Sequence, residues 1–246
     1  MHGAFRSSLT LNKSLKDEMD YLNITLGIAL HSGNTHSSAG QGPLTADLRQ
    51  KILKRDSYTC RFCGFTSQKY QDIHFLDGNP SNIRLENLAT ACIFCHQCFD
   101  LERTAEMRSG ALIWLPEIEQ AQLHHIARAI YVARISQGSM AESAKNAYKI
   151  LMERREEAKN RLGTDDPFIL GTVMRDFTGP RQYSMRAKKL EGVRLFPLDR
   201  RIIKEGDLEF NQFPQILAYW RSKDGPFGGK APYQWKKFYA KFKQAA

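Results

Sequence analysis

Hydrophobic and polar positions change their spacing several times along the chain, beginning with an alternating stretch near the N-terminus. Residues 22–30 read Leu-Asn-Ile-Thr-Leu-Gly-Ile-Ala-Leu, and this near-alternation predicts a strand. Residues 31–43 are rich in Ser, Gly, Asn and Thr without an apolar period, which predicts a flexible linker. His31 and His36 lie in this linker, so we interpret them as solvent-exposed loop residues rather than as ligands.

The next stretch combines a short helix, a strand and a turn. Thr45 is a suitable N-cap for a helix that continues to about Arg55 with its apolar residues on one face. Residues 72–76 predict a short strand. The sequence Asp-Gly-Asn-Pro that follows, at residues 77–80, is typical of a turn, because Gly accepts a positive φ and Pro fixes its own φ.

The second half of the chain has a predominantly helical pattern. Apolar residues recur at spacings of three and four over residues 116–136 and 140–162, which predicts two helices, the second with a solvated charged face. A third helix is predicted over residues 166–177, with Pro167 in its first turn. Residues 190–197 are apolar and predict a strand or an extended packing segment.

The C-terminal tail interleaves aromatic residues with lysines. Such a mixture suits base stacking, the core face of a helix, or an apolar surface that docks a partner protein. We favour core packing and docking, because several of the aromatic residues share one side of a predicted helix: Trp235, Phe238, Tyr239 and Phe242.

Charge is distributed unevenly. The formal net charge of +10 raises nucleic acid or an anionic membrane as partners. From residue 179 to the end, 15 Lys and Arg face six Asp and Glu, whereas residues 45–104 carry eight basic and seven acidic side chains. The central segment is therefore nearly neutral, which is unfavourable for a surface that grips phosphates.

Four of the five cysteines form two Cys-x-x-Cys motifs, Cys60/Cys63 and Cys92/Cys95, separated by 28 residues. Each motif can place two thiolates on one ion, so the pattern predicts one structural Zn²⁺ per chain on four cysteines. Cys98 offers a competing pair with Cys95, but Cys92 and Cys95 match the spacing of the first motif. This cysteine usage indicates a reducing compartment.

Between the two motifs lie residues that resemble the ββα-metal core of HNH nucleases. Asp72 takes the acidic position of that pattern, and a new element that begins at Glu86 or Asn87 carries the second motif into a helix. The resemblance places His74 and His96 at the two ligand positions of a catalytic metal ion and Asn87 at the position that fixes the loop.

The general-base position of this pattern is occupied by Phe75, which cannot accept a proton. A register shifted by one residue would make His74 the base, but it would also turn every side chain of the strand to the opposite face. The turn at residues 77–80 favours the unshifted register, so we expect no nuclease catalysis. His124 and His125 are interpreted as structural, since no Glu-x-x-His pattern accompanies them.

A second resemblance is more specific. Residues 53–70 and 87–99, which include both cysteine motifs, resemble the IcmJ/DotN proteins of type IVB (Dot/Icm) secretion systems. The similarity continues weakly through Trp114-Leu-Pro-Glu, the paired helices and Val193-Arg-Leu-Phe-Pro. The chain departs from that family in keeping more of the HNH pattern.

That resemblance implies a cytoplasmic adaptor, associated with the inner-membrane secretion complex, that binds the C-terminal extension of the coupling ATPase and helps to assemble the platform that receives effector proteins. It implies Cys60, Cys63, Cys92 and Cys95 as zinc ligands and no enzymatic activity. The alternatives are a metal-dependent HNH-type DNA endonuclease and a non-catalytic DNA-binding zinc module.

The sequence therefore predicts an α+β chain with three regions. These are an N-terminal strand and flexible linker (1–44), an HNH-like zinc-binding core (45–110), and a helical region with a basic, aromatic-rich tail (111–246). No stretch approaches the roughly 20 apolar residues that cross a bilayer, and the first residues lack the apolar core of a secretory signal. We expect a cytoplasmic protein without membrane insertion.

Overall fold

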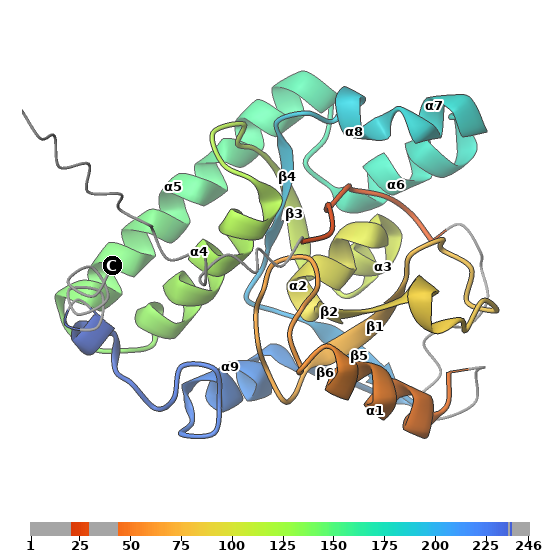
Figure 1. The fold of residues 1–246 in the computed structure, drawn as a ribbon. Helices are drawn as coiled ribbons and strands as arrows, with labels where there is room; N and C mark the ends of the chain where they lie inside the picture. The colour runs from red at the N-terminus through yellow and green to blue at the C-terminus, as the bar shows by residue number, and fades with distance from the viewer. Residues whose placement is uncertain (1–20, 30–43, 236, 238–246) are drawn as a thin grey trace, which may run out of the picture.

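The computed structural model describes residues 21–29, 44–235 and 237 (Figure 1). Within them, helices surround three separate two-stranded antiparallel sheets, which confirms the predicted α+β class. The predicted linker at residues 31–43 and most of the predicted aromatic helix beyond residue 235 lie outside the described residues.

The strand predicted over residues 22–30 is wrong for the residues described. Residues 21–29 form no ladder, and their backbone instead bonds to separate elements. The Leu22 N–H donates to the Arg61 carbonyl at 2.8 Å, and the Gly27 N–H donates to the Cys98 carbonyl at 2.9 Å. Leu26 and Ile28 are buried. The alternation thus reflected one buried side of the segment rather than pairing with another strand.

The helix predicted after Thr45 is confirmed as α1 (Ala46–Arg55). The Thr45 hydroxyl accepts a hydrogen bond from the Leu48 N–H at 3.2 Å, which satisfies one of the free donors of the first turn. Ile52 and Leu53 are buried against β1 (Gln71–Phe75) and β2 (Leu88–Cys92).

Strands β1 and β2 pair antiparallel, with Gln71 opposite Cys92 and Phe75 opposite Leu88. The turn after β1 contains Gly78 at φ 71°, as its sequence predicted, and the short helix η1 (Leu85–Asn87) leads into β2. Helix α2 (Ile93–His96) follows β2 directly and is only one turn long; η2 (Gln97–Phe99) and α3 (Leu101–Glu106) continue the chain. Two strands and a short helix thus surround the cysteine motifs.

A second sheet joins distant parts of the chain. Strand β3 (Gly110–Trp114) pairs with β4 (Val193–Pro197), and Leu112 lies opposite Leu195. Both leucines are fully buried. The sequence predicted a strand or an extended segment at β4, and β4 is a strand; β3 was not predicted. Figure 1 shows this pair between α3 on one side and α4 (Gln120–Arg134) and α5 (Ser139–Leu162) on the other.

The helical predictions are confirmed with shifted ends. Helix α4 begins four residues later than predicted because Glu119 caps it with Gln122. Helix α5 ends at Gly163, whose φ of 78° is the left-handed conformation that glycine tolerates. Helix α6 (Pro167–Asp176) has Pro167 in its first turn, as predicted.

The remaining elements were not predicted. Helices α7 (Pro180–Ser184) and α8 (Arg186–Lys189) follow α6, and β5 (Ile202–Glu205) forms a hairpin with β6 (Leu208–Asn211). Helix α9 (Phe213–Arg221) and the short η3 (Pro232–Gln234) close the described chain.

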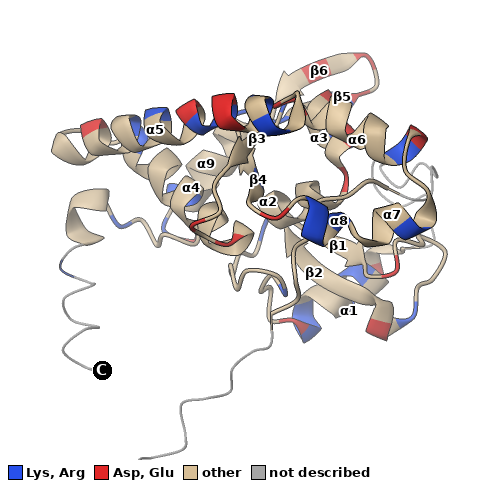
Figure 2. Ribbon diagram, turned by 90° about the horizontal axis from the view of Figure 1, so that it is seen from above, with Lys and Arg blue, Asp and Glu red and all other residues tan. Residues whose placement is uncertain are grey.

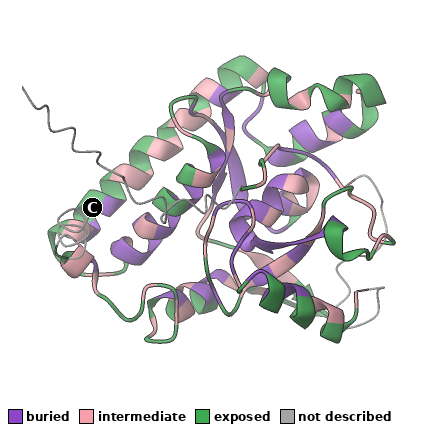
Figure 3. Cartoon of the chain, viewed as in Figure 1, coloured by how far each residue is buried: buried purple, intermediate pink, exposed green. Residues whose placement is uncertain are grey.

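The largest buried cluster unites residues from the cysteine motifs, α4, β4 and α9, including Phe94, Leu123, Phe196 and Trp220. Figure 3 shows this buried centre in purple, with exposed residues along the outer side of α5 and on α8. The cysteine-rich core therefore shares its interior with the helical region. The predicted division at residues 45 and 111 stays a prediction.

Candidate metal centre

The first cysteine motif is shaped by a tight loop before β1. The Gly64 N–H donates to the Cys60 carbonyl at 2.9 Å, and the Cys60 N–H donates to the Phe65 carbonyl at 3.0 Å. Gly64 has a φ of 72°, a left-handed conformation in which a residue with a Cβ is strained. This loop turns the side chains of Cys60 and Cys63 to the same side.

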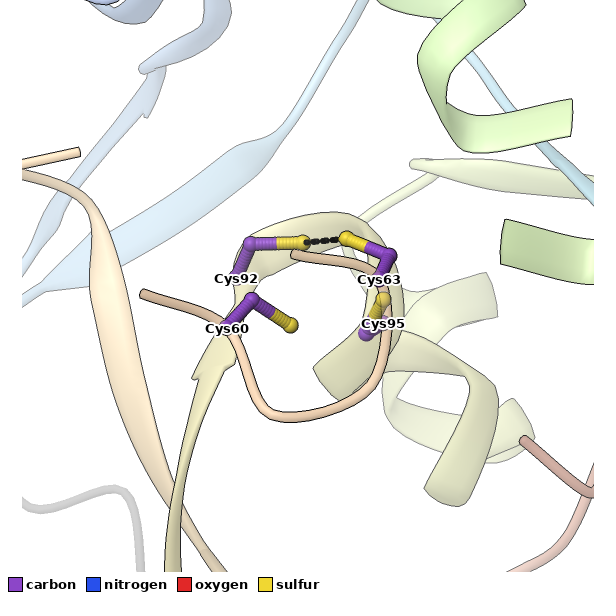
Figure 4. Close-up of side chains that lie close together, drawn as sticks. All are labelled: Cys60, Cys63, Cys92 and Cys95. Atoms are coloured by element: carbon purple, nitrogen blue, oxygen red, sulfur yellow. Dashed lines mark hydrogen bonds between the residues drawn. The ribbon is translucent and has the colours of Figure 1, made fainter. Parts of the chain in front are cut away.

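The second motif faces the first. Cys92 ends β2 and Cys95 lies in α2, so the change from strand to helix brings their sulfurs together. Figure 4 shows the four side chains pointing toward one another. The four Sγ atoms lie within 4.8 Å of one another, and all four residues are buried. The set could hold a metal ion.

The distances fit a tetrahedral ion. A Zn–S bond of about 2.3 Å implies sulfur atoms about 3.8 Å apart along a tetrahedral edge. Cys63 Sγ and Cys92 Sγ are 3.7 Å apart, and none of the four cysteines is in a disulfide. A buried set of four thiol donors at this separation matches the chemistry of a structural site, which needs deprotonated sulfur and no open coordination position.

The electrostatics of the cluster also favour a bound metal ion. Burial raises the pKa of the Cys92 and Cys95 thiols, whereas hydrogen bonds with Cys60, Cys92 and Cys95 lower the pKa of Cys63. Burial of four neighbouring sulfurs thus opposes the thiolate form of at least Cys92 and Cys95 in the absence of a metal ion. A divalent ion between them would favour the thiolate form of all four.

Cys98 lies outside this cluster. Its sulfur is 3.5 Å from the Phe94 carbonyl and 3.7 Å from His124 Nε2, and burial raises the pKa of its thiol. Of the two pairs that the sequence allowed, the cluster thus contains Cys92 with Cys95.

Helix α4 supplies polar side chains around the sulfurs. His124 Nδ1 is 3.2 Å from Cys95 Sγ, and His125 Nε2 is 2.6 Å from the Cys63 carbonyl. Burial lowers the pKa of His124 to about 3, while the side chain of Cys63 and, to a smaller extent, its carbonyl raise the pKa of His125. Both histidines have hydrogen-bond partners inside the fold, as expected for structural residues.

Arg128 is the residue of this site that sequence reasoning missed. Its guanidinium Nη2 lies 2.7 Å from Cys92 Sγ, and the residue is 1% exposed. A pattern could have indicated it: Gln120, His124 and Arg128 follow one another at intervals of four on one face of α4, and all three are buried. Polar residues repeated on the buried face of a helix indicate a shared polar partner.

The positions assigned to a catalytic metal lie on the other face of β1. His74 and His96 come together, with ring centroids 5.8 Å apart. The His74 ring stacks on Phe99 at 4.0 Å and meets Phe62 edge-on at 5.6 Å. Burial, with a smaller contribution from His96, lowers the pKa of His74 to about 3. His74 is therefore a neutral ring within an aromatic cluster.

The other two positions of the HNH pattern lie elsewhere. Phe75, the last residue of β1, packs against the buried cluster that includes Ile52 and Leu53 of α1. Asn87 holds the turn after β1: its amide Nδ2 donates to Asp77 Oδ1 at 2.9 Å, and its Oδ1 accepts from the Asp77 N–H at 2.9 Å. Hydrogen bonds from Asn82 and from the Asn79 backbone lower the pKa of Asp77.

A small cavity of about 60 Å³ adjoins His96. Its walls include Asp72 and Gln97 from the cysteine-rich core and Arg201 and Ile203 from the segment that enters β5. Arg201 is half-buried there, and the loss of water around its guanidinium lowers its pKa. Residues 201–203, at the start of the β5–β6 hairpin, thus lie beside the face of the core that carries Asp72 and His96.

In the described part of the chain, no helix combines the length and apolar character required to span a membrane. The chain as a whole matches no protein-family model. It is similar to a curated protein of Legionella pneumophila (strain Philadelphia 1) named Type 4 apparatus protein DotN, with 36% identity over 193 residues. This similarity covers 77% of the present chain and 90% of the Legionella protein. At this identity and coverage, the chain belongs to the IcmJ/DotN family.

Proposed function

We propose that this protein is a non-catalytic, zinc-stabilised adaptor of a type IVB secretion coupling complex. In this role it binds the C-terminal extension of the coupling ATPase and helps to assemble the platform that receives effector proteins, on the cytoplasmic side of the inner membrane. The similarity to a type 4 apparatus protein over most of both chains supports this proposal.

The proposed cofactor is one structural Zn²⁺ on Cys60, Cys63, Cys92 and Cys95. Four sulfur donors in a tetrahedral arrangement select zinc or an iron–sulfur cluster among common biological metals. A 3.7 Å separation between two of the sulfurs fits a single ion better than a cluster, whose several metal and sulfide atoms hold the cysteines farther apart. When bound, the ion crosslinks the loop before β1 to β2 and α2 and contributes to folding free energy.

The main observation in favour of a non-catalytic protein is the packing of His74 among aromatic rings. In an HNH-like core, a catalytic metal would need His74 and His96 free to bind it, with a base beside them. Here Phe75 replaces the base, and the His74 ring is stacked on Phe99. Arg201 and Ile203, at the start of the β5–β6 hairpin, also lie beside His96. These features support an HNH-like core without nuclease activity.

An exposed apolar face on α6 is the surface we propose for partner binding. Four large apolar side chains on this face are 43% to 76% exposed, so they do not contribute to the core of the protein. They are Phe168, Ile169, Val173 and Phe177. The opposite side of α6 is buried, with Leu170 and Met174 packed in the second core cluster. Exposed apolar surface of this kind is typical of an interaction site.

The surroundings of this face define the chemistry of the partner. Helices α7 and α8 continue directly from α6 and carry Arg181, Lys188 and Lys189, all exposed. None of the three forms an ion pair with a carboxylate in the part of the chain that the structure describes. Figure 2 shows the basic residues of α8 in blue, between α2 and α7 in that view. We therefore expect the bound ATPase segment to present apolar side chains together with Asp or Glu.

Isothermal titration calorimetry tests both the proposed partner and the proposed surface. The purified protein is titrated with the purified C-terminal segment of the coupling ATPase from the same secretion system. Wild-type protein should bind, and Val173→Asp with Phe177→Asp should weaken binding at least about 10-fold, because two charges would replace buried apolar contacts. Leu208→Asp is the matched control: Leu208 is 72% exposed on the β5–β6 hairpin, and its replacement should not change affinity.

No binding by the wild-type protein would overturn the adaptor proposal. Wild-type binding that the α6 double variant leaves unchanged would overturn only the choice of surface. Salt separates the DNA-binding alternative: affinity for duplex DNA that falls steeply with salt would favour it, whereas an apolar protein interface should respond weakly.

A further inference from the structure

Arg128 is a fully buried cation without a carboxylate partner among the described residues. It is 1% exposed, and its Nε and Nη1 atoms have no hydrogen-bond partner there. The guanidinium lies over the Phe65 ring at 3.9 Å and the Phe94 ring at 4.9 Å. These ring contacts favour a cation but do not replace an anion, so its burial needs another source of negative charge.

The sulfurs of the proposed metal centre are that source. Arg128 Nη2 is 2.7 Å from Cys92 Sγ and 3.9 Å from Cys63 Sγ, one sulfur from each cysteine motif. A divalent ion on four thiolates leaves two net negative charges in an interior that water does not reach. A single guanidinium beside these thiolates reduces that charge by half and gains an anionic partner for itself.

The same face of α4 also reaches Cys95 through a histidine of defined tautomer. The Gln120 amide is held by the backbone of β4, because its Oε1 accepts from the Leu195 N–H at 2.9 Å and its Nε2 donates to the Leu195 carbonyl at 2.8 Å. The opposite amide orientation would place like groups against each other. The Gln120 amide nitrogen therefore donates its second proton to His124 Nε2, 2.8 Å away.

Because Nε2 of His124 accepts this bond, the ring proton resides on Nδ1. That N–H points at Cys95 Sγ, 3.2 Å away, and donates to the thiolate. Helix α4 thus contributes two groups to the sulfurs, a cation at Cys92 and a hydrogen-bond donor at Cys95. Both residues come from a region of the chain outside the cysteine motifs.

We infer that Arg128 is the built-in counter-cation of the metal centre and that, with His124, it makes α4 part of that centre. The inference rests on the proposed Zn²⁺. Its consequence is a coupling between metal binding and the packing of the helical region. Removal of the metal ends the crosslink that holds the sulfurs together beside Arg128, so the packing of α4 against the cysteine-rich core should loosen.

Zinc affinity, measured by competition with a chromophoric chelator, tests the role of Arg128. Arg128→Met keeps the length and apolar contacts of the side chain but removes its charge, and it should weaken zinc binding about 10- to 100-fold, as for other groups that support metal ligands. Arg128→Lys should lose less zinc affinity than Arg128→Met, because lysine retains the positive charge. Arg134→Met is the matched control, since Arg134 lies on the same helix, stacks over the Tyr148 ring at 4.2 Å and pairs with Asp199.

Hydrogen exchange gives a second readout that does not depend on how well Arg128→Met folds. Removal of zinc from the wild-type protein with a chelator should raise amide exchange in α4 together with β2 and α2. The inference is overturned if α4 keeps its protection while β2 and α2 lose theirs, if Arg128→Met binds zinc as tightly as the wild type, or if the control Arg134→Met loses as much zinc affinity as Arg128→Met. Failure of the wild-type chain to bind zinc would overturn both this inference and the proposed cofactor.

Discussion

The two faces of the β1–β2 and α2 unit have opposite characters. One face gathers four buried sulfurs within 4.8 Å of one another, with polar side chains from α4 directed at them. The other brings His74 and His96 together but places them beside aromatic rings and the start of the β5–β6 hairpin. One face thus groups its cysteines as a metal site requires, whereas the histidines of the other face pack against aromatic rings.

Substitution of a cysteine in the four-sulfur cluster should have the largest effect on metal binding and stability. Cys92→Ser should abolish zinc binding and destabilise the fold by several kcal/mol, because the bound metal contributes folding free energy and Arg128 would lose its partner. Thermal denaturation and metal content measure both effects. Cys98→Ser is the control, because Cys98 lies outside the cluster; it should keep the metal and cost less stability. Equal melting behaviour of Cys92→Ser and the wild type would contradict the structural role of the metal.

The buried His74 predicts an effect of pH on the opposite face. The pKa of His74 is about 3 in the folded protein and near 6.5 in the unfolded chain, so the unfolded state binds an extra proton as pH falls. The stability that the neutral ring contributes is present above pH 6.5 and is lost as pH falls from there toward 3.

His74→Phe removes this titration while keeping an aromatic ring. Compared with the wild type, the variant should therefore gain up to about 1.4 kcal/mol of relative stability for each pH unit below 6.5. Chemical denaturation at pH 7 and pH 5 gives the comparison. A stability difference that stays constant between these pH values would show that His74 is not held neutral.

The smallest effect is expected at His96. Under the adaptor proposal, His96→Ala should leave binding of the coupling-ATPase segment within about two-fold of the wild type, because His96 lies beside the small cavity rather than on the α6 face. The calorimetric assay described above measures it. A large loss of binding, with the metal content unchanged, would place the interface near His96 instead of on the α6 face.

Local signals in the sequence predicted the site better than they predicted the sheet. The Cys-x-x-Cys spacing fixes two sulfurs within a few residues, and Thr45 caps its own helix, so both were accessible to sequence reasoning. Strand β3 pairs with β4, which lies about 80 residues later, and no local pattern encodes that partner. Residues 22–29 alternate because one side is buried, yet no neighbouring strand pairs with them.

Arg128 shows a different reason for a missed residue. A charge in a predicted helix is normally assigned to the solvated face, since burying it alone is unfavourable. Only the folded chain brings Cys92 beside it, from 36 residues away, and supplies the aromatic rings on which it lies. The three-residue pattern of Gln120, His124 and Arg128 is the sequence signal that such a partner exists.

The contrast between the two faces is tested most directly by plasmid cleavage with purified, zinc-loaded protein in Mg²⁺, Mn²⁺ or Ni²⁺, comparing the wild type with His74→Ala. Neither protein should cleave the plasmid, and each should hold about one zinc per chain, if the sulfur site holds a structural ion and His74 is a packing residue. Cleavage by the wild type that His74→Ala abolishes would show a working active site and contradict the adaptor proposal.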